Sequence, residues 1–128
     1  MSAIQIFIHL AWTTLGRRAM IDEPTRAILV DCFQMAASKN GVEILSMGIV
    51  KTHVHLLVRA PARLDLPHFL QALKGGSSYV VNRSAGIRIG LRWASEYSAT
   101  SISPKHLERV RRYVQNQAEH HAGEGIAG

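Results

Sequence analysis

Two histidines separated by one apolar residue form the part of this chain best suited to chemistry. His53 and His55 flank Val54 in a short run that is otherwise largely apolar. Alternate residues of a β-strand point to the same face, so a strand here presents both imidazoles on one side and Val54 on the other. Neutral imidazole is the commonest side-chain metal ligand. The pair predicts a metal site, with two half-exposed surface histidines as the alternative that this pattern alone leaves open.

A second group of reactive side chains lies near the end of the chain. Tyr113 and Gln117 are four residues apart in a helix predicted from Ser103 to about His121, so they lie one turn from each other. The face that this helix turns toward the protein is marked by Leu107, Val110, Val114 and Gln117. If the helix meets the histidine pair, a phenol and an amide oxygen would supply a nucleophile and a third metal ligand. Taken singly, each residue is more simply explained by a structural role.

The four groups together suit the breaking and rejoining of a phosphodiester. A divalent ion held by two imidazoles and the Gln117 carbonyl would polarise a phosphate. The Tyr113 hydroxyl, with an ordinary pKa of about 10, attacks weakly without such help. A phosphotyrosine also retains the bond energy that rejoining needs, whereas plain hydrolysis uses a water. The combination therefore favours strand transfer over hydrolysis.

The charge of the chain favours a nucleic-acid partner. Fifteen Lys and Arg residues oppose nine Asp and Glu residues, which gives a net charge of +6 and a pI of about 10.1. Eleven of the fifteen are Arg, whose planar fork matches phosphate oxygens. A basic surface can also serve solubility alone. The candidate phosphate-binding residues are Arg17, Arg18, Lys74, Arg109 and Arg112.

Hydrophobic periodicity predicts an alternation of strands and helices. Strands are expected at residues 4–14, 42–51, 53–59 and 92–102, and helices at residues 22–40, 65–82 and 103–121. Asp22 or Glu23 is expected to cap the first helix, and Asp65 to open the second. The order β-α-β-β-α-β is that of a ferredoxin-like α+β sandwich, in which two helices cover one face of a four-stranded antiparallel sheet. We expect the extra C-terminal helix to carry the tyrosine.

The length of the chain fits one domain, expected at residues 1–121 and followed by a flexible tail at 122–128. Cys32 is interpreted as a small buried apolar residue of the first helix. A lone cysteine excludes an internal disulfide and fits a reducing cytoplasm. No segment resembles a signal peptide or approaches the roughly 20 apolar residues of a membrane span. We therefore expect a soluble cytoplasmic protein without a membrane partner.

Four sequence blocks together resemble the single-tyrosine HUH transposases of insertion sequences and their repeat-associated relatives. The blocks are HLAWTT at 9–14, HVHLLV at 53–58, LKGGSS at 73–78, and RYVQNQ at 112–117 with His120-His121. The first and last blocks alone are weak. The histidine pair and the tyrosine-glutamine helix, in this order on a ferredoxin-like pattern, are the specific part of the resemblance.

The resemblance implies a metal-dependent endonuclease and transferase that acts on single-stranded DNA. By the family pattern, His53, His55 and Gln117 would bind Mg²⁺ or Mn²⁺, and Tyr113 would attack the DNA to give a 5′-phosphotyrosine. The implied partner is a single-stranded DNA hairpin in a prokaryotic cell, at the nucleoid. Insertion-sequence relatives form homodimers that exchange the tyrosine helix, whereas repeat-associated relatives look monomeric. Both arrangements, with the tyrosine acting in trans or in cis, stay open at this point.

One position departs from the family pattern. Thr52 stands where family members usually have Asp or Asn before the first histidine, so we expect a weaker orientation of the metal ligand. A domesticated, catalytically weak or inactive nucleic-acid-binding module is therefore the alternative function. A metal-binding domain unrelated to nucleic acid is a third.

Overall fold

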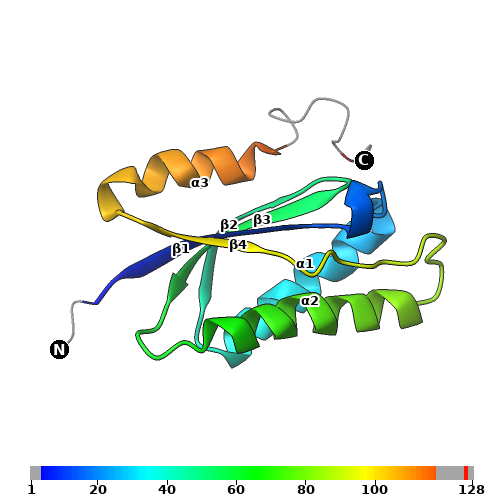
Figure 1. Ribbon diagram of the computed structural model, residues 1–128, viewed down its shortest axis with the longest axis horizontal. Helices are drawn as coiled ribbons and strands as arrows, with labels where there is room; N and C mark the ends of the chain where they lie inside the picture. Colours follow the sequence, from blue (N-terminus) through cyan, green and yellow to red (C-terminus); the bar gives the residue numbers. More distant parts are fainter. Residues whose placement is uncertain (1–3, 118–125, 127–128) are drawn as a thin grey trace.

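The computed structural model describes residues 4–117 and residue 126, and these residues form one sheet and three α-helices (Figure 1). The strands are β1 (Ile6–Thr13), β2 (Glu43–Ile49), β3 (His53–Ala60) and β4 (Ser98–Ile102). The helices are α1 (Glu23–Lys39), α2 (Leu66–Arg83) and α3 (Leu107–Gln115), with short 3-10 turns at Leu15–Arg17 and Pro104–His106. None of these helices is long and apolar enough to cross a membrane.

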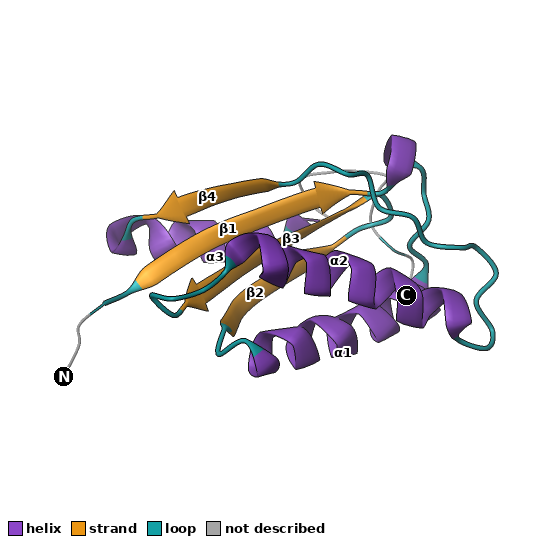
Figure 2. Ribbon diagram, turned by 60° about the horizontal axis from the view of Figure 1, so that its bottom comes forward, coloured by secondary structure: helices purple, strands orange, loops and turns teal. Residues whose placement is uncertain are grey.

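The four strands form a single antiparallel sheet in the order β2-β3-β1-β4. Helices α1 and α2 lie side by side against one face of the sheet (Figure 2), and α3 lies on the opposite face (Figure 1). Helix α3 contacts mainly β2 and β3. This topology confirms the predicted ferredoxin-like sandwich, and Tyr113 lies on the extra helix α3.

The hydrophobic core fills the space between the sheet and the α1–α2 pair. It includes Leu10, Trp12, Val54, Leu56 and Val58 from the sheet, and Leu29, Phe33, Phe69, Leu70 and Leu73 from the helices. Burial of each such side chain stabilises the fold by about 1.5–3 kcal/mol. Because strand residues alternate in direction, β3 sends its valines to this core and its two histidines to the other face.

Both long helices begin at the expected cap residues. The side chain of Asp22 accepts a hydrogen bond from the backbone N–H of Thr25 (3.0 Å), and hydrogen bonding to Thr25 lowers the pKa of the Asp22 carboxyl. Asp65 accepts in the same way from the N–H of His68 (3.1 Å) at the start of α2. A proline stands in the first turn of each helix. The predicted start and end of α1 are confirmed, with Asn40 as the C-cap.

The fourth strand is shorter than predicted. It was expected at residues 92–102, but β4 spans only Ser98–Ile102, because the preceding backbone forms a loop bound to α2. The side chain of Asn82 donates to the carbonyl of Leu91 (2.8 Å) and accepts from its N–H (2.7 Å). Lys74 Nζ donates to two backbone carbonyls farther along this loop (2.8 and 3.3 Å). Together with one isolated antiparallel bridge between Thr14 and Trp93, these side-chain bonds take the place of a continuous strand ladder over this part of the chain.

Two further expectations are corrected or limited by the structure. Cys32 is partly exposed and lines a surface groove between α1 and α2, so the interpretation as a buried core residue was wrong. The last helix opens with a 3-10 turn at Pro104–His106, and α3 proper begins at Leu107. It ends at Gln115 with Asn116 as its C-cap, so the predicted helix does not run unbroken through Gln117. The rest of its expected course to His121, the domain limit there and most of the expected tail lie outside the described residues.

Candidate active site

The two histidines lie on the face of the sheet that α3 covers. His53 is 4% exposed and His55 is partly buried, whereas Val54 between them is completely buried in the core. The rings meet edge to face with their centroids 5.1 Å apart. Strand β3 therefore holds both imidazoles on one side of a rigid support, as the sequence predicted.

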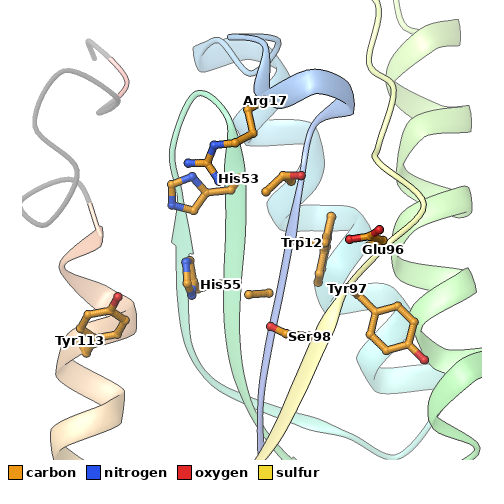
Figure 3. A pocket seen from close by; sticks show the side chains of 10 residues that line it. Trp12, Arg17, His53, His55, Glu96, Tyr97, Ser98 and Tyr113 are labelled. Carbon is orange, nitrogen blue, oxygen red and sulfur yellow. The ribbon is translucent and has the colours of Figure 1, made fainter.

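A cavity of about 400 Å³ opens beside the histidine pair (Figure 3). Its polar lining comes from Thr13, Arg17, His53, His55, Glu96, Tyr97, Ser98 and Tyr113. These residues belong to β1, β3, β4, α3 and the loops next to the strands. Segments far apart in the sequence therefore meet at one hollow, which contains imidazole, phenol, carboxylate and guanidinium groups.

Tyr113 faces the histidines from α3. Its ring lies edge-on to the His55 ring, with the centroids 6.1 Å apart, and its side chain is 41% exposed. In Figure 3 the tyrosine stands across the hollow from His53 and His55. A phenol that is accessible to solvent and also borders the imidazoles of its own chain can meet a phosphate that reaches the same cavity.

Each imidazole has a specific contact at its Nδ1 atom. His53 Nδ1 lies 2.9 Å from the hydroxyl of Thr52, and His55 Nδ1 lies 2.8 Å from Nε2 of His9. The carbonyl of Thr52 accepts two hydrogen bonds from the buried Thr14, one from its backbone N–H (2.8 Å) and one from its hydroxyl (3.1 Å). With Nδ1 engaged, Nε2 is the nitrogen that each ring can offer to a metal. Thr52 thus supplies an oxygen to the first histidine despite its departure from the family pattern.

Gln117 is anchored beside the histidines but does not line their cavity. Its side chain is 1% exposed, and its Nε2 donates to the carbonyl of Tyr113 (3.0 Å). It packs on Gly48 of β2, the residue paired with His55 across the β2–β3 ladder. Gln117 lines the adjoining hollow with Gly48 and Met47. Its position is thus one strand away from His55.

Two imidazoles alone do not complete the coordination of a divalent ion. Among the described residues, no three His, Cys, Asp or Glu side chains are grouped as a metal site, so a third ligand from this part of the chain would be of another type. The Oε1 atom of Gln117 is buried and accepts no hydrogen bond within the described part of the chain. Such an orphaned carbonyl oxygen is costly unless a partner satisfies it. Two imidazoles and this oxygen therefore fit a divalent cation in their chemistry.

The predicted phosphate-binding residues separate into three groups. Arg17 lies in the cavity beside His53 (Figure 3), with its backbone in the left-handed region at φ 53°, which is uncommon for a residue with a side chain. Arg109 and Arg112 line a hollow on the other side of Tyr113. Arg112 also lies 3.7 Å from the carboxylate of Glu108, at the exposed surface.

The other two predicted phosphate ligands lie outside the cavity. Arg18 is exposed next to the 3-10 turn that follows β1. Lys74 binds loop carbonyls and borders a separate groove along α2. Burial lowers the pKa of its ammonium group. The structure therefore gives Lys74 a role in holding the loop, away from the histidine pair.

Sequence reasoning did not single out His9 or Glu96 as site residues. His9 belongs to β1, where it interrupts an apolar run, and burial lowers the pKa of its imidazole. Its contact with His55 spans 46 residues, so only the strand register could have revealed it. Glu96 comes from the loop that was predicted to be strand.

Comparison with known proteins agrees with this fold and with the sequence blocks. Residues 2–117 match the protein family described as transposase IS200 like. The ISDra2 transposase TnpA of Deinococcus radiodurans is 27% identical over 118 residues, which cover 88% of this chain and 84% of that protein. The transposase for insertion sequence element IS200 of Salmonella typhimurium is 26% identical over 108 residues, which cover 80% of this chain and 70% of that one.

The fold is also that of a solved transposase structure. The REP-associated tyrosine transposase bound to a REP hairpin superposes with a TM-score of 0.75 and 13% sequence identity, over 95% of this chain and 72% of that chain. The sequence matches, together with this fold, define a protein of the transposase class. The chain belongs to the IS200-like transposase family, whose match spans nearly its whole length.

Proposed function

We propose that this transposase cleaves and rejoins single-stranded DNA at or near hairpins, with Tyr113 as the nucleophile and His53, His55 and Gln117 as ligands of Mg²⁺ or Mn²⁺. The observation that carries the proposal is the cavity in which the exposed Tyr113 ring borders the His55 imidazole of the same chain. The orphaned Oε1 of Gln117 supports the third ligand. The DNA hairpin in the related solved structure supports the substrate.

The chemical step is an exchange of phosphate esters. The Oη atom of Tyr113 attacks the phosphorus and forms a P–O bond, while the bond from phosphorus to the 3′ oxygen of the preceding nucleotide breaks. The phenol proton is released, and the 3′ oxygen takes up a proton, which leaves a 3′-hydroxyl and a 5′-phosphotyrosine. Attack by a 3′-hydroxyl reverses these changes and rejoins a strand. A bound divalent ion would stabilise the negative charge on the phosphate oxygens.

The basic residues around the cavity would guide the DNA strand. Arg17 lies next to His53 and would contact the phosphate under attack. Arg109 and Arg112 line the hollow on the far side of Tyr113, so a strand that crosses the tyrosine would meet them next. Because these contacts neutralise phosphates, we expect binding that weakens as salt concentration rises.

The chain offers an internal control for the identity of the nucleophile. It has three tyrosines: Tyr113 and Tyr97 line the cavity, whereas Tyr79 lies on α2. Each is replaced by phenylalanine, and the proteins are incubated with labelled single-stranded hairpins and Mn²⁺. We expect a denaturant-resistant protein-DNA adduct from the parent, Y79F and Y97F proteins, and none from Y113F. An adduct from Y113F that equals the parent's would remove Tyr113 from the mechanism.

The arrangement of tyrosine and histidines within one chain also favours action in cis. Mixing Y113F with H53A tests this, because each variant lacks one half of the site. In cis, the mixture stays inactive; in trans, with helices exchanged between two subunits, the mixture regains adduct formation.

The second candidate function is a nucleic-acid-binding module without catalysis, which the net charge of +6 favours. It predicts hairpin binding that is sensitive to salt but is unchanged in H53A and H55A proteins, with no adduct under any condition. The Thr52 hydroxyl beside His53 Nδ1 favours the catalytic proposal. It can orient the His53 ring, the function that was in doubt because Thr52 replaces the usual Asp or Asn.

A further inference from the structure

We propose that His9 is a positioning residue that accepts a hydrogen bond from Nδ1–H of His55 and so fixes the tautomer of His55 that presents Nε2 to the metal. This role depends on the proposed function, because it concerns a proposed metal ligand. His9 belongs to neither the histidine pair nor the tyrosine helix. Its contribution would be made through His55 alone.

The strand register explains why these two rings meet. His55 is paired with Ala11 of β1, and His9 is paired with Leu57, so His9 and His55 are diagonal neighbours on the same face of the sheet. Diagonal neighbours lie about 7–8 Å apart at their Cα atoms, within reach of ring side chains. The methyl group of Ala11 leaves the space between them open.

The two rings form a close, ordered contact. The ring planes are nearly parallel, at 20°, with centroids 5.0 Å apart, and Nε2 of His9 lies 2.8 Å from Nδ1 of His55. This distance is that of a hydrogen bond between ring edges, which requires one proton between the two nitrogens. The hydrogen bond therefore determines which nitrogen of His55 carries the proton.

Only one of the two proton positions allows His55 to bind a metal through Nε2. If His9 donates, a neutral His55 must carry its proton on Nε2, where it blocks ligation. If His55 donates, its Nε2 has the lone pair and His9 carries its own proton on Nδ1. The Thr52 hydroxyl can accept from His53 Nδ1 in the same manner. Each proposed imidazole ligand thus has its own acceptor, one from the preceding residue and one from β1.

The test compares replacements that separate the hydrogen bond from the presence of a ring at this position. H9Q keeps an oxygen that can accept from His55, whereas H9F keeps a ring without an acceptor. T100V serves as a matched control, because Thr100 is exposed and pairs with His9 across the β1–β4 ladder. Thermal unfolding of each variant shows that the fold is retained.

Two readouts are measured, and the first needs neither metal nor DNA. Side-chain ¹⁵N NMR of the metal-free protein, above the pH range where imidazole titrates, reports which nitrogen of His55 is protonated. We expect Nδ1–H in the parent, T100V and H9Q proteins, and a mixture of tautomers in H9F. The second readout is the Mn²⁺ dissociation constant. We expect it to rise about 10–100-fold in H9F and to stay close to the parent value in H9Q and T100V.

Several results would overturn the role of His9. They are Nε2–H at His55 in the parent, an unchanged tautomer and Mn²⁺ affinity in H9F, or an H9Q protein as impaired as H9F. Failure of the proposed function is distinguished separately. If the parent binds no Mn²⁺, or if Y113F forms the adduct, the catalytic proposal fails, while the NMR measurement still decides whether His9 sets the tautomer of His55.

Discussion

Replacement of Gly48 by alanine tests whether the contact between α3 and β2 sets the geometry of the active site. A Cβ atom at this position would lie 2.1 Å from the carbonyl oxygen of Val114 and 2.6 Å from Cγ of Gln117. The first of these is a backbone atom, which cannot rotate away as the end of a side chain can. Helix α3 must therefore move away from the sheet for the methyl group to fit.

The required movement can be estimated from these distances. Ordinary contact begins at 3.4 Å, so the Val114 carbonyl must retreat from 2.1 Å by about 1.3 Å. Overpacking of this kind costs about 1–3 kcal/mol, which for a chain of this length lowers the melting temperature by about 3–12 °C. A misplacement of about 1 Å at a reacting group can cost about 100-fold in rate. Because Tyr113 and Gln117 both depend on α3, we expect the rate of adduct formation to fall by about that factor.

The assay is the rate of covalent adduct formation with a labelled single-stranded hairpin and Mn²⁺, measured beside thermal unfolding. G76A is the matched control. A Cβ at Gly76, in the middle of α2, meets nothing within 4 Å, and alanine is favoured over glycine inside a helix by about 0.5–1 kcal/mol. We expect G76A to be slightly more stable than the parent and equally active.

One outcome would refute this reasoning. If G48A formed the adduct within twofold of the parent rate and melted at the same temperature, the close approach of α3 to β2 would not govern the site. A loss of stability in G48A with the rate unchanged would separate packing from catalysis. In that case the position of Tyr113 would not depend on this contact.

Two further substitutions and one thiol alkylation test parts of the fold away from the cavity. D22A should lower the free energy of unfolding by about 1 kcal/mol, because Asp22 caps α1 through the N–H of Thr25. Hydrogen bonding to Thr25 lowers the pKa of the Asp22 carboxyl in the folded state. The stabilisation is therefore present above the pKa of this carboxyl in the unfolded chain, and it is lost as the pH falls through the pKa of the folded state. Chemical denaturation of D22A and D22N across pH checks both statements. N82A should cost about 1–3 kcal/mol, since two hydrogen bonds to Leu91 are lost, and limited proteolysis should then cut the adjacent loop sooner. Cys32 should react more slowly with an alkylating reagent than a free peptide thiol at the same pH, because burial raises the pKa of its thiol; an equal rate would contradict this.

The regular elements followed from local patterns in the sequence. Alternation in β3 placed Val54 in the core and the histidines opposite it, and the caps Asp22 and Asp65 located the starts of α1 and α2. These signals are local, since a strand face or a cap depends on residues within one or two turns of each other. The structure agrees with the sequence at these positions because the deciding interactions are short in range.

The fourth strand shows where local patterns fail. Trp93 gives the segment from Arg92 onward a strand-like composition, yet its indole donates to Ser77 on α2 (3.1 Å) and its ring meets Trp12 at 5.8 Å. Aromatic residues that anchor a loop to a helix have the same composition as those of a strand. Trp93 keeps one isolated bridge to Thr14, and the contacts with α2 replace the rest of the expected ladder.

In the candidate site too, local features could be predicted from the sequence and long-range contacts could not. Spacing alone placed the histidines on one strand and predicted that Gln117 lies one turn from Tyr113, whose carbonyl accepts a hydrogen bond from the Gln117 side chain although α3 ends at Gln115. The contact of His9 with His55 and the fit of α3 over Gly48 could not be predicted, because each depends on the register between separate strands or on a close approach of two layers. Gly48 has no side chain to attract notice in the sequence.

Strand β3 serves two layers at once, and this limits how the chain can vary in length. Its residues alternate between the packed interior and the face that bears the histidines. Insertion or deletion of one residue ahead of His53 within this ladder would exchange the two sets, which would turn imidazoles inward and valines outward. Residues Ser84 to Gly90, at the start of the connection from α2 to β4, form no strand pairing and carry no such constraint. Among related sequences, changes in length should therefore accumulate in that segment and be absent from β3.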